Sequence, residues 1–299
     1  MNTLGFDIGG TQCRAALVTQ EGEILAQRSV PTPRTVPALE DAIVGLVDEL
    51  RPLEPAAVGL AVAGFLDPAR EIVRFAPHLP WRDAPVRARL QERLALPVVL
   101  EHDANAAAWG EYRFGSARGA GTWVFFAVGT GIGAALMIDG QLFRGAFGTA
   151  PEFGHLTVVP GGRECACGKR GCLERYASGT ALADTAVAHG MAPRLSGHAI
   201  MEAARAGDER ARAVLAEFAG WLGQGLSIVA DVLDPELIVL GGGVSDDADL
   251  FLAGAVAEMG RSIVGAGHRR LPVVGTAELG AHAGMIGVSD LARTDTQGE

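Results

Sequence analysis

Three cysteines and a histidine crowd into the segment EFGHLTVVPGGRECACGKRGCLE, which spans residues 152–174. One imidazole and three thiolates are the donor set of a tetrahedral structural Zn²⁺ site, so this segment predicts a bound zinc ion. The expected ligands are His155, Cys165, Cys167 and Cys172. A reduced cluster of surface thiols is the alternative. Because four protein ligands leave no open coordination position, such a zinc ion would organise structure and would not activate water.

Two glutamates flank this segment. Glu152 and Glu174 stand at its ends, and His155 keeps a second ring nitrogen when the first binds a metal. Carboxylates accept hydrogen bonds, and an imidazole whose tautomer is set by a metal presents a defined partner on its other side. The pattern therefore favours a ligand with a ring of hydroxyl groups.

A further carboxylate, Asp103, stands in EHDANAAAWGE at the junction of an expected strand and an expected helix. Aspartate is a good helix N-cap, and that structural role alone would explain its position. The helix after it begins with small side chains, which indicates that something packs closely against Asn105 and Ala106. A carboxylate there could accept the proton of an attacking hydroxyl, a role typically worth about 10²- to 10⁴-fold in rate.

Three glycine turns follow apolar strands: DIGGT at 7–11, GTGIG at 129–133 and GGGVS at 241–245. Glycine lets backbone amides approach an anion closely, so such turns suit phosphates, although each alone could be only a tight turn. A Walker A loop is excluded because it needs a lysine after its last glycine, and the only lysine is Lys169 among the cysteines. A dinucleotide fold needs a helix after its first turn, whereas DIGGTQCRAALV continues as a strand. A hairpin-type phosphate clamp remains, in which Asp7 holds Mg²⁺ through water because that ion dehydrates reluctantly.

Alternating strand-like and helix-like segments carry these residues, and this order predicts an α/β fold. We expect helices near residues 37–50 and 85–95, another from Asp103 to Arg113, and a long amphipathic helix that stops before Pro235. The segment RFGSARGAG is typical of a domain junction, since it combines glycines and arginines without an apolar period. After it, the chain repeats the order strand, glycine turn, strand, which indicates a duplication.

The composition of the chain limits the classes of protein to which it can belong. The chain has 299 residues, of which 48% are hydrophobic and 20% charged, so it can bury a full core as one large domain or two ordinary ones. A formal net charge of −10 makes nucleic acid an unlikely principal partner. The first residues enter a strand without a basic leader, and apolar runs such as TWVFFAV are far shorter than the ~20 residues that cross a bilayer. We therefore expect a cytoplasmic protein without a membrane partner.

Taken together, these motifs resemble the ROK family of sugar kinases and repressors, within the actin-like, hexokinase-like (ribonuclease H-like) ATPase superfamily. The resemblance covers nearly the whole chain and rests on DIGGT, DANAAAWGE, EFGH, CACGKRGCLE and LGGGVS, which occur in the family's order. The segments FAPHLPWRD and DANAAAWGEYRFG are most similar to glucokinases of high-GC Gram-positive bacteria. Repressors of the family carry a winged helix before the DIGGT strand, and only six residues precede Asp7, so an enzyme is expected.

The resemblance implies two α/β domains and a zinc-binding loop. Residues 1–115 with 283–299 would form the small domain, with the first phosphate loop and the catalytic aspartate. Residues 116–282 would form the large domain, with the zinc loop, the second phosphate turn and the adenosine motif. A homodimer or homotetramer is the usual assembly of relatives.

The resemblance also implies transfer of the γ-phosphoryl group of MgATP to the 6-hydroxyl of glucose. Asp103 would be the general base. The sugar would be bound by His102, Glu152, His155, Glu174 and Gly64. The nucleotide would be bound by Gly9, Gly10, Thr11, Thr130, Gly131, Gly242 and Gly243. Zn²⁺ would be structural, Asp7 would hold Mg²⁺, and ATP would be the co-substrate.

Three residues depart from the family pattern. His102 stands where the family usually has asparagine before the catalytic aspartate, Gln12 where lysine is common, and Pro151 where glycine is usual. The first and third of these differences bear on the expected sugar. Three alternatives to an ATP-dependent glucokinase stay open. The first is a kinase for N-acetylglucosamine, mannose or fructose, the second a polyphosphate-dependent glucokinase, and the third a sugar-sensing regulator that has lost catalysis.

Overall fold

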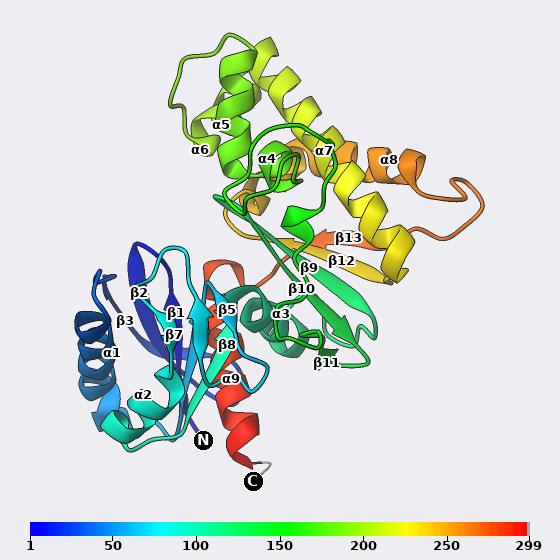
Figure 1. Cartoon of the computed structure of the whole chain (residues 1–299). Coiled ribbons are helices and arrows are strands. Elements are labelled where there is room, and N and C mark those ends of the chain that lie inside the picture. Colours follow the sequence, from blue (N-terminus) through cyan, green and yellow to red (C-terminus); the bar gives the residue numbers. More distant parts are fainter. Residues whose placement is uncertain (298–299) are drawn as a thin grey trace. The chain divides into compact units, whose positions relative to one another are not determined.

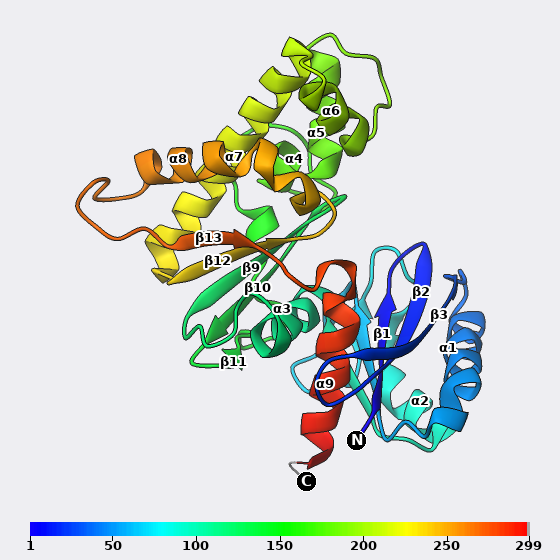
Figure 2. The same ribbon diagram turned by 180° about the vertical axis from the view of Figure 1, so that it is seen from behind.

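The computed structural model describes residues 1–297, which form two compact units (Figures 1 and 2). The first unit comprises Met1–Gly119, Ala135–Pro151 and the chain from Ala281 onward; the second comprises Ala120–Ala134 and Glu152–Gly280. Residues 135–151, which we expected in the second domain, belong to the first unit. The Tyr112 hydroxyl packs against Gly140, and Arg144 pairs with Glu101, so contacts distant in sequence hold this segment there.

The first unit is built on a five-stranded sheet with the order β3-β2-β1-β4-β8. The strands are β1 (Thr3–Ile8), β2 (Gln12–Val18), β3 (Ile24–Pro31), β4 (Val58–Val62) and β8 (Val98–His102). Strands β1, β4 and β8 are mutually parallel, whereas β2 is antiparallel to both β1 and β3. Because parallel strands end at one edge of a sheet, the residues after β1, β4 and β8 are brought to the same edge.

Helices cover both faces of this sheet in the two views (Figures 1 and 2). They are α1 (Val36–Leu50), the 3₁₀ turn η1 (Arg51–Leu53), α2 (Val86–Leu94), α3 (Asp103–Phe114) and α9 (Ala283–Gln297). A small sheet of β5 (Phe65–Leu66), β6 (Val73–Phe75) and β7 (Arg82–Ala84) lies between β4 and α2 in the sequence.

Large apolar side chains fill the α1–α2 side of the sheet, where Phe6 and Ile8 pack with Leu39 and Ile43. On the other side, glycines admit α9 closely. A Cβ on Gly5 would clash with the Met285 carbonyl, and one on Gly59 would clash with the Val288 carbonyl. The position of α9 against the sheet therefore depends on strand residues without side chains.

The second five-stranded sheet has the order β11-β10-β9-β12-β13. Its strands are β9 (Trp123–Val128), β10 (Ile132–Ile138), β11 (Gln141–Leu142), β12 (Leu237–Gly241) and β13 (Val273–Thr276). Strand β12 is parallel to both β9 and β13. Strand β10 begins in the second unit, and its residues from Ala135 belong to the first.

Most of the helices belong to the second unit. They are α4 (Glu174–Ala177), α5 (Gly179–Ala188), α6 (Gly197–Arg205), α7 (Glu209–Leu233) and α8 (Leu252–Ser262), with the 3₁₀ turns η2 (Phe153–His155) and η3 (Ser245–Leu250). A further 3₁₀ turn, η4 (Gly280–His282), begins at the last residue of this unit and continues into the first. Helix α7 is the long helix that we expected before Pro235. Asp208 caps its start by accepting from Arg210 N and Ala211 N, and Asp234 ends it in the left-handed conformation.

Helix α7 is also a candidate for a membrane-spanning helix. By length and composition alone it is long and apolar enough to cross a bilayer, the one such helix within residues 1–297. However, 61% of its most apolar stretch is buried inside the protein. A core helix of a folded domain meets the same criterion, so this is weak evidence for a membrane span.

Candidate functional site

Two carboxylates meet at the edge of the first sheet where β1 and β8 end. Asp7 is the next-to-last residue of β1, and Asp103 follows β8 directly. Burial and the nearby charge of Asp103 raise the pKa of Asp7 to about 6, and the Arg14 guanidinium opposes that rise only in part. Two carboxylates that repel each other at one strand edge form a site where a divalent cation would be stabilised.

Asp103 is the first residue of α3 and does not cap it. The N-cap position is held by His102, which makes no side-chain capping hydrogen bond. Oδ1 of Asp103 accepts from Ala104 N at 2.8 Å and lies 3.2 Å from Nε2 of His102. The Asp103 side chain is 43% exposed. The helix-capping explanation from sequence is therefore wrong, and the carboxylate is open to a ligand.

The first glycine turn packs against residues 75–81, none of which is among the expected site residues. Gly9 N donates to Gln12 O at 3.1 Å, which closes the turn between β1 and β2. A Cβ on Gly10 would lie 2.6 Å from Cβ of His78, and one on Gly64 would lie 2.7 Å from the Phe75 carbonyl oxygen. Both glycines thus allow close approach of the chain that contains FAPHLPW, and tertiary packing alone reveals this contact.

The zinc-ligand atoms in the second unit lie together. One atom from each of the four residues falls within a group whose members are all within 4.8 Å of one another. Cys165 Sγ lies 3.7 Å from Nδ1 of His155, and the sulfurs of Cys167 and Cys172 are 3.6 Å apart. A tetrahedron with Zn–S bonds of about 2.3 Å has edges of about 3.8 Å, whereas a disulfide needs about 2.05 Å. The donor set and its spacing fit zinc.

The expected sugar-binding side chains of the second unit surround this cluster. His155 turns Nδ1 toward Cys165 and Nε2 toward Glu152, whose Oε2 is 3.9 Å away. Glu174, at the start of α4, places Oε1 4.0 Å from Cys165 Sγ, and its Oε2 accepts from Ile132 N at 2.9 Å. A metal on Nδ1 would leave Nε2 as a donor beside the Glu152 carboxylate.

The fourth cysteine takes no part in the cluster. Cys13 is fully buried in β2 of the first unit. Burial and the charge of Asp7 raise the pKa of its thiol to about 12. Cys13 is therefore neutral and unreactive at physiological pH.

The second glycine turn opens onto a cavity of about 480 Å³. Gly129 O accepts from Gly179 N at 2.7 Å, and Thr130 O accepts from the Thr180 hydroxyl at 2.8 Å. These bonds fasten the N-terminus of α5 to the turn, so the positive end of the helix dipole lies beside the cavity. Sequence analysis missed this helix start, although Ser178, whose hydroxyl accepts from Ala181 N, is an N-cap signal.

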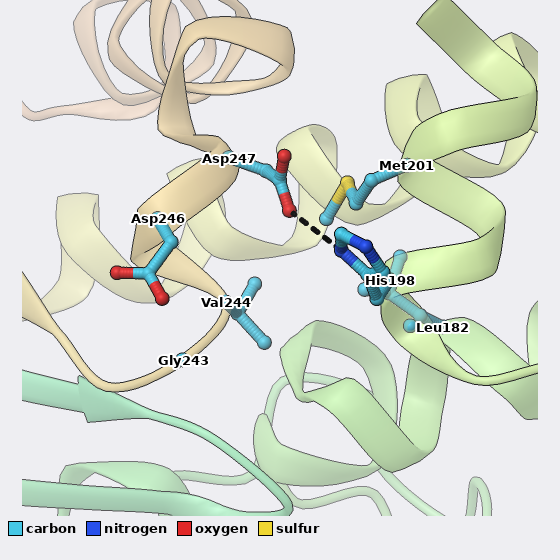
Figure 3. A pocket seen from close by; sticks show the side chains of 8 residues that line it. Leu182, His198, Met201, Gly243, Val244, Asp246 and Asp247 are labelled. Atoms are coloured by element: carbon cyan, nitrogen blue, oxygen red, sulfur yellow. Dashed lines mark ion pairs between the residues drawn. The ribbon is translucent and has the colours of Figure 1, made fainter. Parts of the chain in front are cut away.

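A second cavity, of about 220 Å³, shares Gly197, His198, Gly243 and Val244 with the first. Leu182 and Met201 give one side of it apolar walls, and Val244, Asp246 and Asp247, at the start of η3, line the other side (Figure 3). Nδ1 of His198 lies 4.0 Å from Oδ2 of Asp247 (Figure 3). Apolar walls with a few polar groups suit a planar heterocycle, and the phosphate turn borders the adjoining cavity.

Comparison with known proteins agrees with this geometry. The family model described as "ROK family" matches residues 3–295. The chain belongs to the ROK family. Among ROK proteins, it is 42% identical to the glucokinase of Streptomyces coelicolor, over 97% of each chain.

Two solved ROK structures are similar along their whole length. The ROK glucokinase from Streptomyces griseus, solved in complex with glucose and AMPPNP, is 41% identical with a TM-score of 0.89, covering 98% of this chain and 100% of that one. The ROK hexokinase from Thermus thermophilus is 32% identical with a TM-score of 0.84 and covers 100% of both chains. The expected family and its hexokinase-like α/β fold are confirmed.

The three departures from the ROK pattern occupy distinct places. His102 contacts the Asp103 carboxylate, as described above. Gln12 begins β2, where its carbonyl closes the first phosphate turn. Pro151 is the last residue of the middle segment of the first unit and directly precedes Glu152. His102 lies against the expected base, so it is the departure that bears most directly on the chemistry.

Proposed function

We propose that this ROK protein transfers the γ-phosphoryl group of ATP to the 6-hydroxyl of glucose, forming glucose 6-phosphate and ADP. The observation that carries the proposal is its likeness, at 41% identity over nearly the whole chain, to a ROK glucokinase solved with glucose and AMPPNP. The placement of Asp103 and the anion-binding features of the Gly129–Gly131 turn support it.

Asp103 is the proposed general base. Its known contacts, with Ala104 N and His102, both engage Oδ1. As the sugar oxygen forms its bond to the γ-phosphorus, the carboxylate accepts the hydroxyl proton, while the bond from phosphorus to the bridging oxygen breaks and ADP leaves. Positioning supplies most of the rate in such transfers, because the phosphoryl group needs little covalent assistance.

The proposed sugar contacts are His102 and Gly64 in the first unit with Glu152, His155 and Glu174 in the second. The zinc ion would serve structure. By binding Nδ1 of His155 it would leave Nε2 protonated as a donor to one sugar hydroxyl, with the Glu152 carboxylate beside it as an acceptor.

The proposed nucleotide contacts are Gly9, Gly10 and Thr11, then Thr130 and Gly131, and finally Gly242 and Gly243. The phosphates would occupy the larger cavity against the α5 N-terminus, and the base the smaller one beside Val244. Asp7 would hold Mg²⁺, since burial and the Asp103 charge raise the pKa of its carboxyl and a bound cation would favour the ionised form. The ion would neutralise phosphate charge.

A coupled ADP-release assay over a panel of hexoses tests the proposal. We expect the highest kcat/KM with glucose and ATP, and a loss of at least about 10²-fold in kcat for Asp103→Asn with little change in KM. Near-parental turnover by that variant would refute the assigned base. A higher kcat/KM with N-acetylglucosamine, mannose or fructose, or with polyphosphate as donor, would replace the assignment of glucose and ATP. Repeating the panel with His102→Asn shows whether His102 determines the sugar preference.

Sugar binding without ADP production under saturating MgATP would instead indicate a regulator.

We further propose that the enzyme is a cytoplasmic homodimer or homotetramer that feeds glycolysis. Four free cysteines, three of them in a zinc-type donor set, suit a reducing compartment. Light scattering after size-exclusion chromatography measures the assembly, and a monomeric mass would contradict it.

A further inference from the structure

A buried carboxylate stands two residues before Asp103. Glu101 lies in β8, and its side chain is 1% exposed. Burial opposes its ionisation, but the Arg144 guanidinium and the Asn105 amide hold the pKa of this carboxyl below its ordinary value. A buried charge is costly and an apolar residue would pack there at no such cost, so folding alone gives little reason for a carboxylate at this position.

One oxygen of Glu101 contacts the chain on both sides of Asp103, the backbone before it and a side chain after it. Oε1 accepts from His102 N at 3.1 Å and from the Asn105 Nδ2 amide at 3.0 Å. His102 precedes Asp103, and Asn105 lies in the first turn of α3. The strand-to-helix junction that carries Asp103 is therefore clamped by a single carboxylate oxygen.

The other oxygen is held by two arginines of the first unit. Oε2 accepts from Nη2 of Arg144 at 2.6 Å and from its Nε at 3.0 Å, and Nη1 of Arg70 lies 3.5 Å away. Arg70 in turn pairs with Asp295 of α9 at 3.1 Å. Both donors of the planar Arg144 guanidinium reach the same carboxylate oxygen, so together they fix the position of Oε2.

Arg144 also ties down the segment that leads to Glu152. Its carbonyl accepts from Ala150 N at 3.2 Å, which closes residues 144–150 into a loop on this arginine. The loop ends one residue before Pro151, after which Glu152 begins the zinc segment. The same residue pair thus anchors both the Asp103 junction and the loop of residues 144–150 within the first unit.

We propose that Glu101, held by Arg144, is a positioning residue for the phosphoryl-transfer reaction, because it fixes the backbone that aims Asp103 at the sugar hydroxyl. This inference rests on the proposed function, in which Asp103 is the base. Glu101 acts through His102 and Asn105 and does not touch the substrate. Its contribution lies in the chemical step, where a displacement of about 1 Å costs about 10²-fold.

The chain offers a matched control for loss of a buried charge. Asp290 on α9 is also 2% exposed and is also paired with two arginines, Arg113 at 2.6 Å and Arg293 at 2.5 Å. It contacts α3 at Trp109 and Arg113, well beyond the first turn that carries Asp103. Asp290→Asn therefore imitates the stability cost of Glu101→Gln without touching the Asp103 junction.

The experiment compares steady-state kinetics per folded, zinc-loaded enzyme for the parent, Glu101→Gln, Arg144→Lys and Asp290→Asn. We expect Glu101→Gln to lower kcat 10- to 100-fold with less than a threefold change in KM for ATP. Arg144→Lys keeps the charge but loses the two-point contact, so we expect a smaller loss of the same kind, and it serves as the test if Glu101→Gln fails to fold. Asp290→Asn should lower thermal stability and leave kcat within threefold.

A double-mutant cycle with Asp103→Asn separates this inference from the proposed function. If Glu101 acts through Asp103, adding Glu101→Gln to Asp103→Asn should reduce the residual rate less than threefold. Three results would overturn the inference. The first is an equal loss of rate from Glu101→Gln in the parent and in the Asp103→Asn background, and the second is an unchanged kcat in Glu101→Gln and Arg144→Lys. The third is a loss of kcat in Asp290→Asn as large as that in Glu101→Gln. Parental turnover by Asp103→Asn alone would overturn the proposed base instead, whatever the Glu101 variants do.

Discussion

Glu174 accepts a hydrogen bond from the backbone nitrogen of Ile132, through Oε2 and at 2.9 Å. One residue earlier, Gly131 leaves room for that carboxylate, since a Cβ there would clash with Oε2. Glu174 follows Cys172 closely in the sequence, and its Oε1 lies 4.0 Å from Cys165 Sγ. One side chain thus joins the cysteine cluster to the second glycine turn, so we expect a change in either to affect the other.

Gly131→Ala tests this connection. The added methyl group must displace the Glu174 carboxylate, so we expect KM for both ATP and glucose to rise about tenfold while the zinc content stays at the parental level. Steady-state kinetics with each substrate varied measures the effect. Gly129→Ala is the control, because a Cβ there meets no heavy atom within 4 Å. If Gly129→Ala raised the KM for glucose as much as Gly131→Ala does, the Glu174 contact would not be the cause of the rise.

Cys167→Ser tests the zinc cluster. We expect about one zinc ion per chain in the parent protein and a large loss in this variant, with a lower melting temperature, because a structural zinc site contributes directly to folding. Metal analysis by mass spectrometry together with thermal denaturation measures both quantities. Cys13→Ala removes the cysteine that lies outside the cluster and should leave the zinc content unchanged. Folded, active parent protein without zinc would contradict the assignment.

Asp7→Asn tests the charge at the strand edge. The pKa of Asp7 is about 6 in the folded protein against an ordinary value of 3.8, so between these values the folded state binds more protons than the unfolded state. The contribution of this group to stability therefore falls as pH rises from about 4 to about 6, by about 3 kcal/mol in total. Asparagine carries no charge, so we expect Asp7→Asn to be more stable than the parent above pH 7 and nearly equal to it at pH 4.

Denaturant unfolding without Mg²⁺ or nucleotide, at matched pH values, checks this expectation. Taking the difference between the two proteins at each pH cancels the titration of the zinc ligands. The same variant should lose activity, because the carboxylate that would hold Mg²⁺ is gone. A stability difference that does not change with pH would show that Asp7 is not the titrating group.

Val244→Trp tests the smaller cavity as the site of the nucleotide base. Val244 is 9% exposed and borders both cavities, so an indole at this position would fill much of the 220 Å³ space. We expect KM for ATP to rise at least tenfold, with glucose binding measured by calorimetry unchanged. Val232→Trp places the same side chain on an exposed part of α7 and should leave both unaffected. Parental KM for ATP in Val244→Trp would place the base elsewhere.

Features that depend on neighbouring residues could be predicted from sequence. The donor types of Cys165, Cys167 and Cys172 determine which metal they suit, and their glycine-rich surroundings determine that the loop can wrap around an ion. The strand-to-helix junction at Asp103 and the end of α7 before Pro235 follow from local backbone preferences. The three glycine turns were recognisable because glycine permits conformations and approaches that other residues do not.

Contacts between residues far apart in sequence depended on the tertiary structure. The order and direction of the strands bring the ends of β1 and β8 to one edge of the sheet, so the charge of Asp103 acts on Asp7. No local sequence pattern predicts that strand order. The pairing of Glu101 with Arg144, like the docking of α5 on the Gly129 turn, is set by packing of whole elements. The sequence states the type of each side chain, but the contacts of that side chain depend on the fold of lowest free energy for the whole chain. For this reason the chemical character of the site could be predicted from the sequence, whereas its geometry could not.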